Sequence, residues 1–171
     1  MTRSKSIRIL GIDPGSRVTG FGVIDYAGSE LTVVEHGSIR TPKDGDFPER
    51  LEVIYNGLGD VIERCRPEVA AVETTFSGLN PRSLIQLSHA RGVILLAVKT
   101  AGLDVFEYSP RSVKSAVVGY GGAEKQQVAK MVRLLVRGLG TAKLGSDAAD
   151  ALAIAICHAH SSGLASRARE T

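Results

Sequence analysis

Long apolar runs are absent from the 171-residue sequence, and so are cysteine motifs and internal repeats. No stretch approaches about 18 uncharged apolar residues in a row, so we predict no membrane-spanning helix. The basic first residues are not followed by an apolar segment with a small-residue cleavage site, so we expect no secretory signal. The two cysteines, Cys65 and Cys157, form no metal or disulfide motif, and we expect them to be reduced thiols buried in a cytoplasmic protein.

Apolar residues make up 43% of the chain, which is enough to bury a core and argues against a disordered protein. A chain of this length suits one domain, since domains commonly have about 100–200 residues. We expect that domain to span residues 1–160, and the small and polar residues 161–171 to form a flexible tail.

The net charge of +3 hides an uneven distribution of charged side chains. Residues 82–143 carry 10 basic and 3 acidic side chains, whereas residues 1–81 carry 9 basic and 12 acidic ones. A basic segment beside an acidic remainder suits a protein that holds a polyanion near a group of carboxylates. Charge alone favours a plainer explanation, that these lysines and arginines solvate helix surfaces.

The spacing of apolar residues predicts an α/β domain. Three short strands over residues 6–13, 20–25 and 31–40 follow one another through tight turns, which indicates an antiparallel meander. Two further strands at 69–73 and 104–108 are separated by helices and are therefore predicted to be parallel. The expected fold is a five-stranded mixed sheet flanked by helices. The glycines of the second strand indicate either a bulge or the close approach of another backbone.

Helical periodicity and capping residues mark the other elements. Asn80 and Ser109 each precede a proline, the pattern of an N-cap followed by proline at the first helical position. The alanine-rich residues 146–160 should form a buried helix. We expect His158 and His160, near its end, to complement the helix dipole rather than to bind metal. The predicted helices span about residues 51–65, 80–100, 109–118, 123–137 and 146–160.

Four carboxylates are candidates for a metal site. Asp13 and Glu73 end predicted strands, and functional groups of an open α/β sheet gather at the carboxyl ends of strands. Asp147 and Asp150 are three residues apart, so both project from one face of the last helix. Three or four carboxylates that meet could hold two Mg²⁺ ions for in-line cleavage of a phosphodiester.

Each carboxylate also has a purely structural explanation. Asp13 precedes Pro14 and Gly15, where aspartate is a common turn former, and Glu73 could end its strand at solvent. Asp147 and Asp150 could cap the start of the last helix. The apolar surroundings of all four favour the functional explanation, because several uncompensated buried anions would be costly without a metal or a shifted pKa.

The chain resembles the RuvC family of Holliday-junction resolvases (crossover junction endodeoxyribonucleases) in three segments. These are ILGIDPGSRVTGFGVID, the VETTF stretch and SDAADALAIAICHAH. The segment VFEYSPRSVKSAVVGYGGAEKQQVAKMVRLLV also resembles the basic segment of the family. The likeness covers about residues 7–160, which is nearly the whole chain.

The resemblance implies a ribonuclease-H-like fold and a symmetric homodimer that cuts four-way DNA junctions by paired symmetric nicks in recombination and repair. It implies dependence on Mg²⁺, for which we expect two ions per active site and Mn²⁺ as an alternative cation, although the sequence does not decide between one ion and two. It also implies the branch-migration proteins RuvA and RuvB as partners. By match to the family's motifs, the catalytic and metal-binding carboxylates are Asp13, Glu73, Asp147 and Asp150.

The same match points to residues that contact DNA. Lys114 and Lys125 fall on the family's lysines near the scissile phosphate, and Lys125 is a candidate catalytic group. Phe76 falls on the aromatic residue that stacks against an unpaired base, which residue chemistry supports for an exposed loop aromatic. Arg82, at the start of its helix, is a weaker candidate for a backbone contact. The structural alternatives are a core position for Phe76 and a solvated helix surface for the lysines.

Resolution of a junction requires two cuts at symmetry-related points, so one site per chain implies a two-fold dimer. The helix over residues 80–100 has more apolar side chains than one stripe against a sheet requires. We expect it to form much of the dimer contact, the alternative being a fully buried core helix. Its apolar residues are Leu84, Ile85, Leu87, Val93, Ile94, Leu95 and Leu96.

Three other functions remain open from the sequence. Residues 11–16 resemble the phosphate loop of actin-like and sugar-kinase ATPases, although this chain supplies only one of the two lobes that such enzymes need. A junction-binding module without catalytic activity, with the carboxylates acting as caps, is the second. A related nuclease that acts on RNA is the third.

Overall fold

A mixed six-stranded sheet forms the centre of the computed structural model, which describes residues 6–74, 80–141 and 143–167. The strand order is β5-β4-β1-β2-β3-β6. As predicted, β1 (Ile7–Asp13), β2 (Val18–Ala27) and β3 (Glu30–Arg40) form an antiparallel meander. The strands β4 (Val69–Glu73) and β5 (Asp104–Tyr108) extend it in parallel from β1.

The sixth strand was not expected. β6 (Val136–Arg137) pairs in parallel with residues 31 and 32 of β3. It replaces the end of the helix predicted over 123–137, which in the structure is α4 (Lys125–Leu135). A strand of two residues is too short to show an alternating pattern, so periodicity does not separate it from the helix that precedes it.

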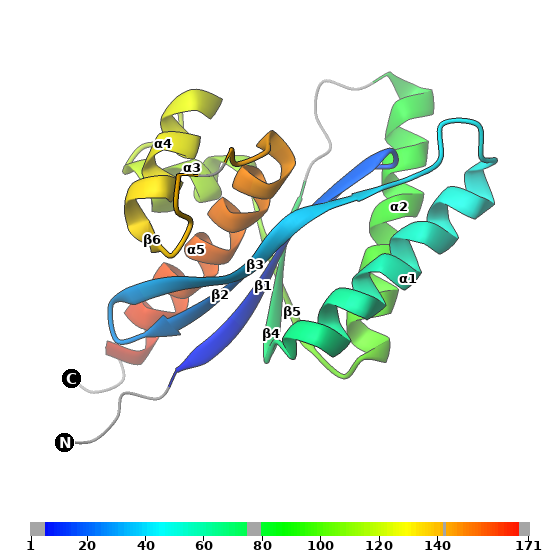
Figure 1. The fold of residues 1–171 in the computed structure, drawn as a ribbon. Helices are drawn as coiled ribbons and strands as arrows, with labels where there is room; N and C mark the ends of the chain where they lie inside the picture. The colour runs from blue at the N-terminus through cyan, green and yellow to red at the C-terminus, as the bar shows by residue number, and fades with distance from the viewer. Residues whose placement is uncertain (1–5, 75–79, 142, 168–171) are drawn as a thin grey trace.

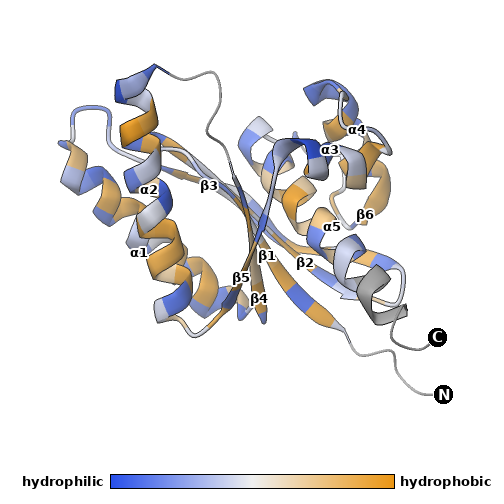
Figure 2. Cartoon of the chain, turned by 180° about the vertical axis from the view of Figure 1, so that it is seen from behind, coloured by the Kyte–Doolittle hydropathy of each residue, from blue (hydrophilic) through white to orange (hydrophobic). Residues whose placement is uncertain are grey.

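Helices cover both faces of the sheet (Figure 1). α1 (Phe47–Cys65) and α2 (Pro81–Thr100) lie on one face, and α3 (Pro110–Val118), α4 and α5 (Ser146–Arg167) lie on the other. The alternation of side chains along a strand divides the core accordingly. Ile9 belongs to the cluster beneath α5, whereas Leu10 belongs to the cluster beneath α1 and α2. Figure 2 shows the apolar sides of the helices turned toward the sheet.

Capping side chains fix where two of the helices begin, as the sequence predicts. The Asn80 side chain accepts a hydrogen bond of 2.9 Å from the Ser83 backbone N–H, and Pro81 is the first residue of α2. The Ser109 hydroxyl accepts one of 3.1 Å from the Ser112 backbone N–H at the start of α3. These caps satisfy backbone donors that a helix end would leave unpaired, and so define the register of both helices.

The last helix is longer than predicted, and its two histidines make contacts that the sequence does not predict. α5 continues past residue 160 to Arg167, so neither histidine lies at its end. His158 is buried, its Nδ1 lies 2.8 Å from the hydroxyl of Tyr108, and burial lowers the pKa of its imidazole. His160 Nδ1 lies 3.0 Å from the Ala116 carbonyl oxygen. The expected dipole role is therefore wrong, and both rings join α5 to the elements beside it.

Glycines let α5 lie directly on the sheet. A Cβ atom placed on Gly11 of β1 would lie 2.1 Å from the carbonyl oxygen of Ala151. One on Gly20 of β2 would lie 2.1 Å from the carbonyl oxygen of Asp147. The close backbone approach expected from the glycines of the second strand is confirmed at Gly20. None of the helices in the described part of the chain has the length and apolar character that crossing a membrane requires.

Candidate active site

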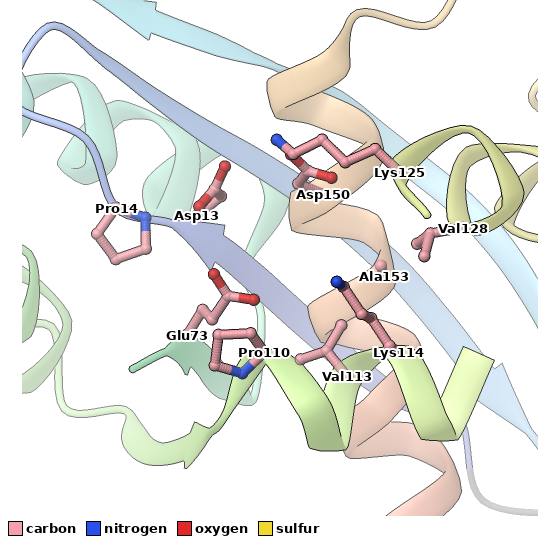
Figure 3. A pocket seen from close by; sticks show the side chains of 10 residues that line it. All are labelled: Asp13, Pro14, Glu73, Pro110, Val113, Lys114, Lys125, Val128, Asp150 and Ala153. Carbon is pink, nitrogen blue, oxygen red and sulfur yellow. The ribbon is translucent and has the colours of Figure 1, made fainter. Parts of the chain in front are cut away.

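Asp13 and Glu73 lie beside each other at one edge of the sheet. β1 and β4 are parallel neighbours with Ile12 opposite Val72, so the residues that follow emerge together. Both carboxylates line a cavity of about 320 Å³, shown in Figure 3. This convergence is what the strand-end positions of the two residues predict.

α5 brings further carboxylates to the same place. Asp150 lines the cavity opposite Asp13 (Figure 3). Asp147, one turn earlier on α5, does not line the cavity, but its charge acts on Asp13. The helix can bring both groups this close because Gly20 leaves room for the backbone of Asp147. The four predicted carboxylates therefore belong to one cluster.

Two lysines reach the cluster from α3 and α4. Lys125, the first residue of α4, donates a hydrogen bond of 3.0 Å from Nζ to Oδ2 of Asp150. Its side chain is 78% exposed, so the ammonium group faces both the carboxylates and solvent. Lys114 of α3 is half-buried and also lines the cavity, with its ammonium group directed toward the carboxylates (Figure 3).

Burial, and after it repulsion between carboxylates, makes Asp13 hard to ionise. Burial and the charges of Asp150, Glu73 and Asp147 together raise the pKa of Asp13 to about 7, and the charge of Lys125 opposes them. The hydrogen bond to Asp150 raises the pKa of Lys125, so that residue keeps its proton. A half-buried carboxyl that is hard to ionise among other acids is a candidate functional group, because a bound cation would favour its charged form.

The donor set fits a hard divalent cation, because carboxylate oxygens are the ligands such ions prefer. Within the described residues, no group of three or more histidine, cysteine, aspartate or glutamate side chains is arranged to hold a metal ion as it stands. In this arrangement the ammonium of Lys125 supplies positive charge beside Asp150.

The other predicted site residues have different outcomes. Arg82 is exposed in the first turn of α2 and does not line the cavity. Phe76 lies outside the described residues. Sequence reasoning missed the apolar wall of the cavity, which includes Val113 and Val128. The signal was present in their spacing, since Val113 precedes Lys114 and Val128 follows Lys125 by three residues on its helix.

The raised pKa of Asp13 predicts a pH-dependent stability in the presence of a chelator. The ordinary pKa of 3.8 rises to about 7 in the folded chain, so the folded state holds an extra proton between these values. The stability that this proton contributes is fully present below about pH 4 and is lost as the pH rises through 7. Asp13→Asn stays neutral, and at about pH 8 it should raise the free energy of unfolding by roughly 2–4 kcal/mol.

Urea unfolding of both proteins in chelator at about pH 4 and pH 8 measures this effect. The variant and the unmodified chain should differ little at the lower pH, where Asp13 is protonated in the folded state. An equal difference at both pH values would show that the substitution acts through packing, and would contradict the electrostatic origin.

The sequence matches proteins of one family. The family profile described as "Crossover junction endodeoxyribonuclease RuvC" matches residues 9–158. A relative of that name from Chloroflexus aggregans is 51% identical over 154 residues, which cover 90% of this chain and 93% of the relative. Another of that name, from Geotalea uraniireducens, is 51% identical over 158 residues, covering 92% of this chain and 91% of the relative.

Solved structures match the fold as well. The structure of "T. thermophilus RuvC in complex with Holliday junction substrate" superposes with a TM-score of 0.85 at 34% identity, covering 93% of this chain and 96% of that one. The yeast mitochondrial Holliday junction resolvase Ydc2 has a TM-score of 0.64 at 16% identity, covering 95% of this chain and 84% of that one, and supports the fold alone. The ribonuclease-H-like fold expected from the sequence is confirmed.

Proposed function

The chain belongs to the RuvC family of crossover junction endodeoxyribonucleases, and we propose that it resolves four-way DNA junctions by paired nicks made at the cavity between β1, β4 and α5. One observation carries the assignment of the site. Asp13, Glu73 and Asp150 come from three elements far apart in the sequence and line one cavity with two lysines. A binding module without catalytic activity would not require this expensive grouping of like charges.

The cluster would hold the divalent cations that the reaction uses. Asp13, Glu73, Asp147 and Asp150 are the ligands we propose, for Mg²⁺ or in its place Mn²⁺, and four carboxylates suit two ions. Bound there, such cations supply Lewis-acid stabilisation of the phosphodiester and a water of lowered pKa. Binding of a cation also offsets the repulsion that raises the pKa of Asp13.

The lysines would contribute hydrogen bonds and positive charge to the scissile phosphate. Lys125 remains an ammonium because Asp150 raises its pKa, so it can donate to a phosphate oxygen without first taking up a proton. Lys114 enters the cavity from the α3 side. Together they would reduce the repulsion that four carboxylates exert on an approaching phosphodiester, and stabilise the charge that develops on its oxygens.

A direct test incubates the full chain with a synthetic four-way junction in Mg²⁺, in Mn²⁺ and in chelator, beside linear duplex DNA and linear RNA. We expect symmetric nicks in the junction alone, and only with a divalent cation. Tight junction binding without cleavage in either cation would favour the binding module. Cleavage of linear RNA would favour a nuclease that acts on RNA, and tight ATP binding would favour a lobe of an actin-like ATPase.

We propose that two copies of the chain assemble through α2. Ile85 and Leu96 of this helix are 57% and 58% exposed and are eleven residues apart, or about three turns, so they lie on one face. Ile94 is fully buried in the chain's own core, so this part of the expected contact set is wrong. The remaining apolar residues are half-buried and could flank the contact: Leu84, Leu87, Val93 and Leu95.

The double variant Ile85→Glu/Leu96→Glu is expected to sediment as a monomer at micromolar concentration, because it would bury four carboxylates at a two-fold interface. The nicks that this variant makes should no longer occur as symmetric pairs in the same junction. Leu134→Glu is the matched control, since Leu134 of α4 is 70% exposed and lies on the other side of the sheet. If the unmodified chain sediments as a monomer, or the double variant as a dimer, this interface is wrong.

Family membership is the basis for two further proposals. We propose that the protein acts with the branch-migration proteins RuvA and RuvB on the same junction, and that it works in the cytoplasm, where the DNA is.

A further inference from the structure

A second groove lies on α3 next to the candidate active site. Its volume is about 710 Å³, and its lining includes Ser109, Arg111, Ser112, Ser115, Tyr120 and Gly121. Arg111, Ser112 and Ser115 share one side of α3 by their spacing, whereas Pro110, Val113 and Lys114 line the active-site cavity. One helix of nine residues therefore supplies a wall to both hollows.

Arg111 is held in place in this groove yet has no ionic partner. A Cβ atom on Gly121 would lie 2.4 Å from Cγ and 3.1 Å from Nε of Arg111, so the arginine stem lies directly on the glycine backbone. Across the described ranges, its guanidinium makes no hydrogen bond or ion pair. A positioned and unpaired guanidinium is suited to binding an external anion.

Tyr120 forms another side of the groove and is tied to the active site. Its side chain is 49% exposed, and its hydroxyl donates a hydrogen bond of 2.9 Å to Oε1 of Gln127. The same oxygen accepts one of 2.8 Å from the Glu124 backbone N–H, in the cap of α4. Lys125 is the first residue of that helix. The cap that sets the position of Lys125 therefore also sets the position of the tyrosine ring.

We propose that this groove binds the phosphodiester backbone of a DNA strand outside the point of cleavage, an inference that rests on the proposed function. Arg111 would contact a phosphate, the hydroxyls of Ser112 and Ser115 would donate to phosphate oxygens, and the exposed ring of Tyr120 would pack against a sugar or base.

Charge and position favour a DNA strand as the occupant. The groove belongs to residues 82–143, which carry 10 basic and 3 acidic side chains. Of those acidic residues only Glu124 is in the α3–α4 region, where it is the N-cap residue of α4. A strand held at Lys114 can continue over the other side of the same helix, so the groove extends the contact with the substrate beyond the cut.

The test measures binding of the full chain to a synthetic four-way junction in chelator over a range of salt concentrations. Arg111→Gln should weaken binding several-fold and lower the slope of log K against log salt by about one, the effect of one lost phosphate contact. Gly121→Ala should weaken binding in the same direction, because its methyl group displaces the stem of Arg111 without removing charge. Arg64→Gln is the matched control. It removes the same charge in the last turn of α1, which covers the face of the sheet opposite α3.

Neutral methylphosphonates placed one at a time in the junction locate the contact. At one position, the neutral phosphate should lower the affinity of the unmodified chain for the junction but leave the affinity of Arg111→Gln unchanged. The variant should still nick the unmodified junction at saturating protein. If Arg111→Gln and Arg64→Gln share the affinity and salt slope of the unmodified chain, the groove proposal is overturned. If the unmodified chain itself fails to bind the junction, the proposed function fails instead.

Discussion

Asp13→Asn is expected to lower the rate of junction cleavage by at least about 10³-fold while junction affinity stays unchanged or rises. Asp13 ends the central strand β1 and lies between Glu73 of β4 and Asp150 of α5, so it faces every carboxylate of the cluster. An amide of the same shape keeps one oxygen but loses the negative charge that a divalent cation requires. The fold should tolerate the change, because the carboxyl is already hard to ionise.

Binding is expected to survive because carboxylates oppose it. Phosphate contacts come from lysine, arginine and neutral donors, and removal of one acid from the cluster reduces repulsion of the DNA backbone. Single-turnover cleavage with Mg²⁺, and a binding isotherm in chelator, measure the two effects separately. Asp60→Asn, the same change at an exposed position of α1, should leave both unaltered. An equal loss of cleavage and binding in Asp13→Asn would argue against a catalytic role.

Much of the fold follows from local signals in the sequence. The meander could be predicted because short apolar strands alternate with turn residues, and the starts of α2 and α3 because Asn80 and Ser109 each precede proline. The neighbouring positions of Asp13 and Glu73 followed from a general property of parallel strands, whose carboxyl ends meet at one edge. Local patterns and simple topology therefore predict most of the site.

The errors arise where tertiary contacts decide the outcome. β6 exists because residues 136 and 137 pair with β3, a partner more than one hundred residues away. The dipole role expected for His158 is wrong because nothing local shows that Tyr108 of β5 contacts its imidazole. Likewise, the ion pair between Lys125 and Asp150 depends on how α4 docks beside α5. Long-range contacts of this kind leave no periodic trace in the sequence.

The least predictable feature of the site is that Asp147 and Asp150 of α5 lie close to Asp13 and Glu73 of the sheet. The spacing of Asp147 and Asp150 places both on one side of α5, but only the approach of α5 to the sheet brings them to Asp13. That approach depends on glycines of β1 and β2, which the sequence shows only as unusual strand residues. In physical terms, a close backbone contact brings the carboxylates of the candidate active site together.

Gly20→Ala is therefore expected to damage both stability and cleavage. The new Cβ atom would lie 2.1 Å from the carbonyl oxygen and 2.6 Å from the carbonyl carbon of Asp147, and neither backbone atom can move aside alone. Either α5 or β2 has to shift. Overpacking of this kind costs typically about 1–3 kcal/mol of unfolding free energy, and contact with backbone places Gly20 at the upper end. A shift of about 1 Å in Asp147 and Asp150 should reduce cleavage roughly 10²-fold.

Chemical unfolding and single-turnover cleavage below the unfolding transition measure the two losses. Gly59→Ala provides the matched control, since a Cβ atom there meets nothing within 4 Å. Alanine in the middle of α1 should instead raise stability by roughly 0.5–1 kcal/mol and leave cleavage unchanged. If Gly20→Ala folded with full stability and cleaved at the normal rate, the first turn of α5 would have to move away from the new methyl group without any energetic cost. The contact between Gly20 and Asp147 could then no longer explain how the carboxylates of α5 are held beside Asp13.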